Sequence, residues 1–116
     1  MWNNFSGRGQ AGFKEITPAE AKKMYDTGEA VLIDVREPVE FSEVRAEGAK
    51  LIPLGSLEQR LHELPSDKDI LMICRSGGRS AMACQIAARA GHSRLYNVSG
   101  GTIAWYQSRL PVETGQ

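Results

Sequence analysis

An uninterrupted apolar run, Ile-Leu-Met-Ile at residues 70–73, constrains the fold of this chain most strongly. A strand that is apolar on both faces has to be covered on both faces, which is typical of a central strand in a parallel sheet. The run ends at Cys74 and is followed by Arg-Ser-Gly-Gly-Arg-Ser at 75–80, where an amphipathic helical pattern begins. The sequence therefore predicts a strand at 69–73, a tight loop, and a helix over 79–90 closed by Gly91.

The rest of the chain repeats this alternation of short apolar runs and helical patterns. Thr17, Pro18 and Glu20 supply an N-cap, a proline at the first helical position and a capping-box glutamate. Further strands are expected at 13–16, 30–35, 51–52 and 95–98. Further helices are expected over 17–26 and at 37–41. Another is expected to begin at residue 56, with Leu57, Leu61 and Leu64 on one face. A last helix is expected to follow Gly100 and Gly101 and to end before Pro111. This order predicts an α/β fold with a largely parallel sheet.

The size and charge of the chain limit its organisation and its partners. A length of 116 residues with 41% hydrophobic content suits one domain, which we expect at 11–116 after a flexible arm at 1–10. Lys and Arg total 14 and Asp and Glu total 14, which argues against nucleic acid or a membrane as a partner. The first residues have neither a basic nor an apolar leader segment, so a cytoplasmic location is expected.

The two cysteines do not form the pattern of a disulfide or a metal site. Cys74 and Cys84 are separated by a predicted helix, whereas a disulfide needs Cα atoms within about 7 Å of each other. His62 and His92 stand alone in different segments, and no CxxC spacing is present. We therefore expect no metal and no cofactor, and we expect Cys84 to be packed in the core.

The surroundings of Cys74 favour a reactive thiolate. The amides of a strand-to-helix loop and of the first helical turn stabilise negative charge at the turn. Gly77 and Gly78 are expected to adopt positive φ and to bring amides around one centre, while Arg75 and Arg79 add positive charge. A buried cysteine followed by an ordinary Gly-Gly turn would be the structural alternative. The combination of thiol, glycines, arginines and helix start favours the reactive site.

Two other segments end at the same edge of the predicted sheet. Asp34, Val35 and Arg36 follow the run at 31–33, and Ser99 and Gly100 follow the last strand. Because ligands of open parallel sheets bind at the carboxyl ends of the strands, these segments and Cys74 could converge on one binding site.

These motifs, taken in order, resemble the rhodanese-like domains. The resemblance rests on Val-Leu-Ile-Asp-Val-Arg-Glu at 31–37, Glu40-Phe41, Gly48-Ala49, Ile-Pro-Leu at 52–54, the loop at 74–80, Gly100-Gly101 and Ala104-Trp105. It implies a three-layer α/β fold with a parallel five-stranded sheet and helices on both faces. It also implies a thiosulfate sulfurtransferase, in which the cysteine takes the outer sulfur of thiosulfate, becomes a persulfide, and passes that sulfur to cyanide or a thiol.

The resemblance and the chemistry together assign roles to the loop residues. Cys74 would be the nucleophile, the amides of residues 75–80 would surround its persulfide, and Arg75 would hold the anionic donor. Arg79 either contacts the donor or braces the loop against Glu40. Ser76 and Ser80 would donate hydroxyl hydrogen bonds, although Ser80 could instead satisfy backbone at the helix start. We expect Asp34 and Arg36 mainly to brace loops around the site.

Alternatives remain open at this point. A persulfide carrier in a protein sulfur relay needs the same loop, and a non-catalytic binding module needs only the fold. Phosphatase or arsenate reductase activity ranks below sulfur transfer for two reasons. Four residues separate Cys74 from Arg79, where cysteine phosphatases have five, and Ile73 stands where they usually have histidine.

The chain also departs from the family pattern beside the expected entrance to the Cys74 site. Val-Arg-Ala-Glu at 44–47 replaces a common Gly-His-Ile-Pro, Leu51 replaces a frequent Asn, and His92 replaces an aromatic residue. The added bulk and charge predict that access of reactants to Cys74, or the choice of sulfur acceptor, differs from that of typical family members.

Overall fold

The fold is built around a five-stranded parallel sheet, seen in a computed structural model that describes residues 12–115. The strands are β1 (Lys14–Ile16), β2 (Ala30–Asp34), β4 (Lys50–Leu51), β5 (Asp69–Ile73) and β6 (Leu95–Val98). Their order across the sheet is β1-β6-β5-β2-β4, which places β5, with its apolar run at 70–73, in the middle. The predicted α/β class, the parallel sheet and the central position of residues 69–73 are confirmed.

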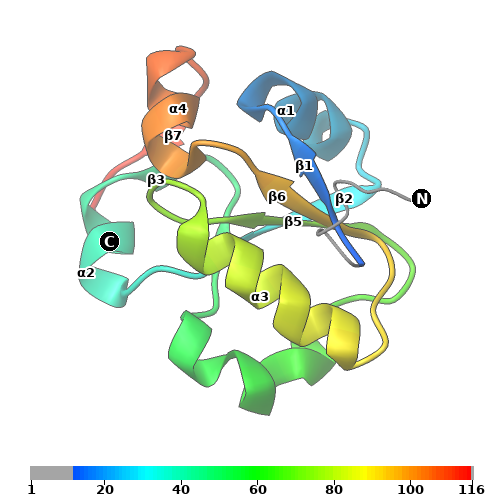
Figure 1. Ribbon diagram of the computed structural model, residues 1–116. Coiled ribbons are helices and arrows are strands. Elements are labelled where there is room, and N and C mark those ends of the chain that lie inside the picture. Colours follow the sequence, from blue (N-terminus) through cyan, green and yellow to red (C-terminus); the bar gives the residue numbers. More distant parts are fainter. Residues whose placement is uncertain (1–11, 116) are drawn as a thin grey trace.

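Helices cover both faces of the sheet and complete three layers (Figure 1). The helices α1 (Pro18–Asp26) and α4 (Gly101–Gln107) pack on one face, while η2 (Leu54–Glu63) and α3 (Gly78–Arg89) pack on the other. The short helix α2 (Pro38–Glu43) lies beside the carboxyl ends of the strands. None of the helices between residues 12 and 115 is long and apolar enough to cross a membrane.

Side chains of β5 alternate between two apolar clusters, one on each face of the sheet. Ile70 and Met72 pack with residues of α3 and η2, including Leu57. Leu71 packs on the opposite face in the cluster that contains Trp105 of α4. Because successive side chains of a strand point to opposite faces, one short apolar run joins both halves of the core.

The start of α1 follows the predicted signals closely. The amide of Glu20 donates to Thr17 Oγ1 at 3.1 Å, and the amide of Thr17 donates to Glu20 Oε1 at 2.9 Å. Pro18 is the first helical residue. This reciprocal pair satisfies two amides that have no partner within a helix, so the sequence fixes where α1 begins.

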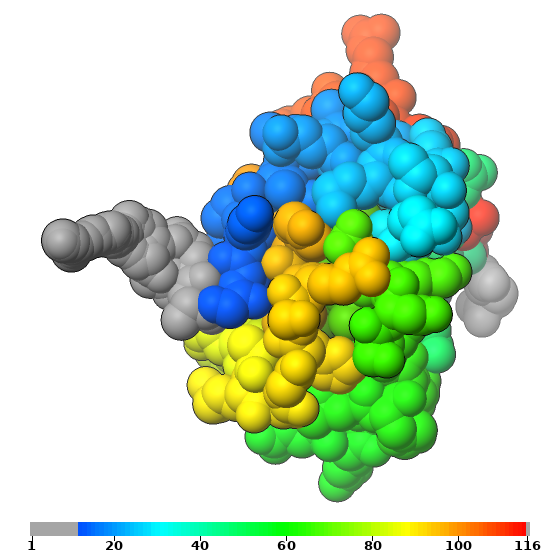
Figure 2. Space-filling model, turned by 90° about the vertical axis from the view of Figure 1, so that its right-hand side faces the viewer, coloured from blue at the N-terminus to red at the C-terminus, as the bar shows by residue number. Residues whose placement is uncertain are grey.

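The amino ends of the strands form the face of the molecule shown in Figure 2. There the turns before β2, β5 and β6 lie side by side: the amide of Asp69 donates to Glu29 O at 2.9 Å, and the amide of Ile70 donates to Arg94 O at 2.7 Å. The carboxyl ends of the same strands, and with them Cys74, therefore lie at the other end of the sheet.

Several expectations from the sequence need correction. The helix expected from residue 56 is η2, a 3-10 helix that starts at Leu54 and is kinked at Arg60, so its turns are tighter than those of an α-helix. Gly78 does not have positive φ, because it is already the first residue of α3. An antiparallel pair, β3 (Arg45–Ala46) with β7 (Val112–Glu113), was not predicted. The arm expected at residues 1–10 lies outside the described residues.

Candidate active site

Cys74 lies between the carboxyl end of β5 and the start of α3, and only residues 75–77 connect it to the helix. Gly77 has a φ of +117°, a conformation that L side chains rarely adopt, and it directly precedes the helix. This turn brings the loop back toward the sulfur. The side chain of Cys74 is only 1% exposed.

Two groups donate hydrogen bonds to the sulfur of Cys74. The amide of Gly77 lies 3.1 Å from Cys74 Sγ, and Ser80 Oγ lies 3.3 Å from it. Both donors come from the loop and from the first turn of α3, whose N-terminal amides carry partial positive charge. The site therefore stabilises a negative charge on sulfur.

The pKa of Cys74 reflects two opposed effects. Burial of the sulfur raises the pKa, because a charged group loses its hydration. The Ser80 hydroxyl and the amides of Ser80, Gly77 and Ser76 act in the other direction, and together they lower the pKa of Cys74 below its ordinary value. Cys74 is therefore more readily ionised than a free thiol.

A buried asparagine controls one of these donors. Gly77 O accepts from the Ala81 amide at 3.2 Å and from Asn97 Nδ2 at 3.2 Å, and Ser80 Oγ also lies 3.2 Å from it. A carbonyl oxygen has two lone pairs and a hydroxyl has one proton. Ala81 and Asn97 already donate to Gly77 O, and this favours donation of the Ser80 hydroxyl proton to Cys74 Sγ over its donation to Gly77 O.

Asn97 is itself held in this orientation by Glu15 on the neighbouring strand β1. Its Nδ2 donates to Glu15 Oε2 at 2.9 Å, and Ser99 Oγ donates to Glu15 Oε1 at 2.7 Å. Asn97 is 2% exposed, and its Oδ1 has no hydrogen-bond partner among the described residues. A flipped amide would turn Oδ1 toward the Glu15 carboxylate and Gly77 O, two acceptors, so the observed orientation is the favourable one.

The two loop arginines differ in their partners. Arg79 donates to the Glu40 carboxylate through both terminal nitrogens, at 2.8 and 2.9 Å, and this contact lowers the pKa of Glu40 to about 2. Arg79 therefore joins the start of α3 to α2. Arg75 is exposed and forms no ion pair with any residue between 12 and 115. Its guanidinium is free to meet an anion.

Asp34 and Arg36 form a buried pair beside the loop. Arg36 Nη2 donates to Asp34 Oδ2 at 2.8 Å and to Val44 O at 2.7 Å, and Arg36 Nε also donates to the Asp34 carboxylate. The side chains are 4% and 0% exposed. This pair fixes the end of β2 against the segment that leads into β3.

The start of α4 packs directly against the back of the loop. The amide and the hydroxyl of Thr102 both donate to Cys74 O, at 2.8 and 2.9 Å. A Cβ placed on Gly101 would lie 2.5 Å from Cys74 O, so only glycine permits this approach. Helix α4 thus holds the backbone of Cys74 in place.

Other singled-out residues lie away from the sulfur. Cys84 is fully buried on α3, and burial raises the pKa of its thiol; both cysteines are free. Trp105 is buried and its ring nitrogen donates to Pro111 O at 2.8 Å. His62 is exposed, and His92 is partly buried in the turn after α3.

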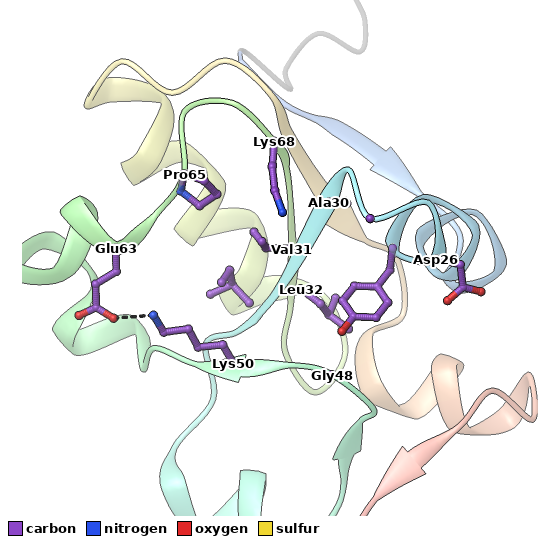
Figure 3. A pocket seen from close by; sticks show the side chains of 12 residues that line it. Asp26, Ala30, Val31, Leu32, Gly48, Lys50, Glu63, Pro65 and Lys68 are labelled. Carbon is purple, nitrogen blue, oxygen red and sulfur yellow. Dashed lines mark ion pairs between the residues drawn. The ribbon is translucent and has the colours of Figure 1, made fainter.

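A hollow of about 680 Å³ does not contain Cys74 (Figure 3). It lies along the first half of β2, where Ala30, Val31 and Leu32 form one wall, and the Lys50–Glu63 ion pair crosses its edge. Its lining includes no thiol, hydroxyl of Ser or Thr, or imidazole. This hollow therefore offers no nucleophile, and the candidate active site rests instead on the contacts of Cys74.

Sequence reasoning missed Glu15, Asn97 and Thr102. A weak signal existed for Asn97, because it is a polar residue in an otherwise apolar strand, and such a residue is usually hydrogen-bonded when buried. The pairing of β1 with β6, which brings Glu15 opposite Asn97, is a property of the sheet order and not of the local pattern.

Comparison with known proteins identifies the relatives of this chain. The model of the rhodanese-like domain matches residues 17–108. A protein named sulfurtransferase from Allochromatium vinosum is 35% identical over 92 residues, covering 79% of this chain and 86% of the relative. The thiosulfate sulfurtransferase GlpE of Glaesserella parasuis is 37% identical over 103 residues, covering 89% of this chain and 95% of the relative.

A solved structure supports the same fold. The crystal structure of a rhodanese-related protein from Thermoplasma volcanium superposes with a TM-score of 0.78 at 28% identity, covering 86% of this chain and 97% of that protein. The resemblance noted in the sequence motifs is thereby confirmed at the level of family and fold.

Proposed function

Because the chain belongs to the rhodanese-like domain family, we propose that it is a sulfurtransferase that carries sulfane sulfur on Cys74. The proposed donor is thiosulfate or a similar anion, and the acceptor is cyanide or a thiol. The observation that most directly supports this is the pair of donors to Cys74 Sγ, the Gly77 amide and the Ser80 hydroxyl, which lower the pKa of the thiol.

In the first half-reaction the Cys74 thiolate attacks the outer sulfur of thiosulfate. A new bond forms between Cys74 Sγ and that sulfur, the S–S bond of thiosulfate breaks, and its electron pair leaves with sulfite. A thiolate and a dianion thus become a persulfide anion and sulfite, with no change in total charge. The amides of residues 75–80 are proposed to stabilise the negative charge that passes to the outer sulfur.

Arg75 is proposed to bind the sulfonate of the donor, because its guanidinium is exposed and unpaired within the described residues. A fixed positive charge offsets the repulsion between thiolate and dianion. Arg79 donates two hydrogen bonds to Glu40, and it is therefore proposed to brace the loop. The buried pair of Asp34 and Arg36 is proposed to support the Cys74 loop by fixing the end of β2 against Val44.

The narrow access to Cys74 also suits this donor. Because Cys74 as a residue is only 1% exposed, a reactant has to present its reacting sulfur as a terminal atom, as thiosulfate does. In the second half-reaction an acceptor thiol attacks the outer sulfur. The persulfide anion and R–SH then give the Cys74 thiolate and R–S–SH, so that atoms and charge balance.

The direct test separates loading from transfer. The protein is incubated with thiosulfate, its intact mass is measured for the gain of one sulfur atom, and cyanide is then added while thiocyanate is followed. Turnover is expected in the wild type and in Cys84→Ala, and it should be absent in Cys74→Ser. Alanine is the better control at position 84, because a serine hydroxyl would be buried there without a partner.

Other outcomes point to the alternatives. Loading only from a persulfidated donor protein, and not from thiosulfate, would indicate a persulfide carrier in a sulfur relay. Loading from neither would indicate a binding module and overturn the proposed transfer chemistry.

A further inference from the structure

A second hollow, of about 350 Å³, adjoins the Cys74 loop between α2 and α4, and its size is in the range of small-molecule sites. Both helices lie at the end of the sheet where β5 leads into the loop (Figure 1). Val44, Thr102, Ile103 and Tyr106 supply walls of the hollow, and Arg75 lies at its boundary with the loop.

The walls of this hollow are attached to the loop that carries the sulfur. Thr102 donates twice to Cys74 O, and the amide of Ile103 donates to Arg75 O at 3.2 Å. On the other side, Glu40 lines the hollow and holds Arg79. The hollow therefore borders the loop at Arg75, the residue next to Cys74, although Cys74 itself is not part of its lining.

Exposed apolar side chains gather at this hollow beside its charged residues. The large exposed hydrophobic residues of the described chain are Val39, Met82, Ile103 and Tyr106. Ile103 and Tyr106 both line the hollow, at 39% and 65% exposure, and Val44 adds a third apolar wall. Apolar side chains gathered at a concave site typically mark the place where a ligand or partner is bound.

Thiosulfate and cyanide have no carbon chain and gain nothing from such a surface. The walls carry two carboxylates, Glu40 and Glu43, and two guanidinium groups, Arg36 and Arg75, so their formal charges cancel and the lining as a whole does not favour an added anion. A thiol acceptor, in contrast, has to bring an organic group to the persulfide.

Building on the proposed function, we propose that the hollow between α2 and α4 binds the apolar carbon chain of a thiol acceptor while its sulfur reaches the Cys74 persulfide. The acceptor sulfur forms a bond to the outer persulfide sulfur, the Sγ–S bond breaks, and its electron pair returns to Cys74 Sγ. The acceptor leaves as R–S–SH. Ile103 and Tyr106 then determine which thiols are used, without taking part in the chemistry.

The test measures discharge of the persulfide in a single turnover. The protein is loaded with thiosulfate, or with inorganic polysulfide if thiosulfate does not load it, and then mixed with mercaptoethanol, mercaptobutanol or mercaptohexanol. In the wild type the second-order rate constant for discharge is expected to rise about tenfold along this series, because the four added methylenes are partly buried against walls that are themselves partly exposed. In Ile103→Ser and Tyr106→Ser this dependence on chain length should largely disappear. Met82→Ser, an exposed apolar residue on α3 outside the hollow, should retain it.

The outcomes separate this inference from the proposed function. If thiosulfate fails to load Cys74 but polysulfide-loaded protein still shows the chain-length dependence, the donor assignment is wrong and the acceptor site stands. If loading and cyanide turnover succeed but the wild-type rate constants are equal across the series, the acceptor site is wrong. The same conclusion follows if Ile103→Ser keeps the full dependence.

Discussion

At the level of single residues, the Ser80 hydroxyl is the one side chain among the groups that lower the pKa of Cys74. Ser80 Oγ lies 3.3 Å from Cys74 Sγ and 3.2 Å from Gly77 O. In Ser80→Ala the thiolate loses this donor, so the pKa of Cys74 should rise. A hydrogen bond to a charged acceptor is worth about 1.5 kcal/mol, and the rate of alkylation by iodoacetamide at acidic pH should fall about tenfold. An unchanged pH profile of alkylation would show that Ser80 only caps backbone.

Asn97 should influence the Ser80 hydroxyl proton indirectly, through its hydrogen bond to Gly77 O. In Asn97→Ala, Gly77 O loses one donor and competes for the Ser80 hydroxyl, so the pKa of Cys74 should rise by less than in Ser80→Ala. The readout is again the pH profile of alkylation. Ser99→Ala is the matched control, because it removes a hydrogen bond to Glu15 but leaves the contact of Asn97 with Gly77 O intact. A fall in thermal stability without any shift of the profile would contradict this positioning role.

At the level of elements, the contact between α4 and the loop depends on one glycine. A Cβ at Gly101 would lie 2.5 Å from Cys74 O, and φ is +59° there, so Gly101→Ala should lower the free energy of unfolding by about 2 kcal/mol. Gly78→Ala is the matched control: no atom lies within 4 Å of its Cβ position, and alanine favours helix. Urea unfolding of both variants tests this. Equal destabilisation by the two changes would mean that α4 can shift to accommodate a side chain.

The tether between α2 and α3 should be sensitive to pH. The pKa of Glu40 is about 2 in the folded protein against an ordinary value of 4.5, since Arg79 stabilises the carboxylate. A lowered folded-state pKa contributes stability above the ordinary value, and this contribution is lost as pH falls toward about 2. Because both side chains are partly exposed, Glu40→Gln should cost only about 1 kcal/mol at neutral pH, and its deficit should shrink in acid. Urea unfolding against pH measures the difference. Glu43→Gln on the same helix, which has no ion pair among the described residues, should show no such trend.

At the level of the whole molecule, β5 connects the two apolar clusters. Leu71 and Met72 are both fully buried but point into opposite clusters. Leu71→Ala and Met72→Ala should each lower the free energy of unfolding by about 3 kcal/mol. In both variants, circular dichroism in the peptide and aromatic regions should give a single coincident transition, because the central strand belongs to both clusters. Separate transitions would show that the two layers unfold independently.

The elements that the sequence predicted well carry strong local signals. The capping box at Thr17, the apolar run at 70–73 and the glycine turns each determine an element through neighbours close in the chain. The pair of β3 with β7 joins segments of two residues, which are too short for any periodicity. The contact of Asn97 with Gly77 depends on the order of strands in the sheet. Local patterns thus predicted the loop around Cys74, but not the side chains that arrive there from other strands.

The burial of Cys84 has a consequence under oxidative stress. The chain holds two cysteines, and the second is fully buried with a raised pKa, so it stays protonated and reacts slowly. If peroxide converts Cys74 to a sulfenic acid, Cys84 is a poor resolving thiol for forming an internal disulfide. Recovery of the oxidised protein then depends on a reductant from outside, such as glutathione.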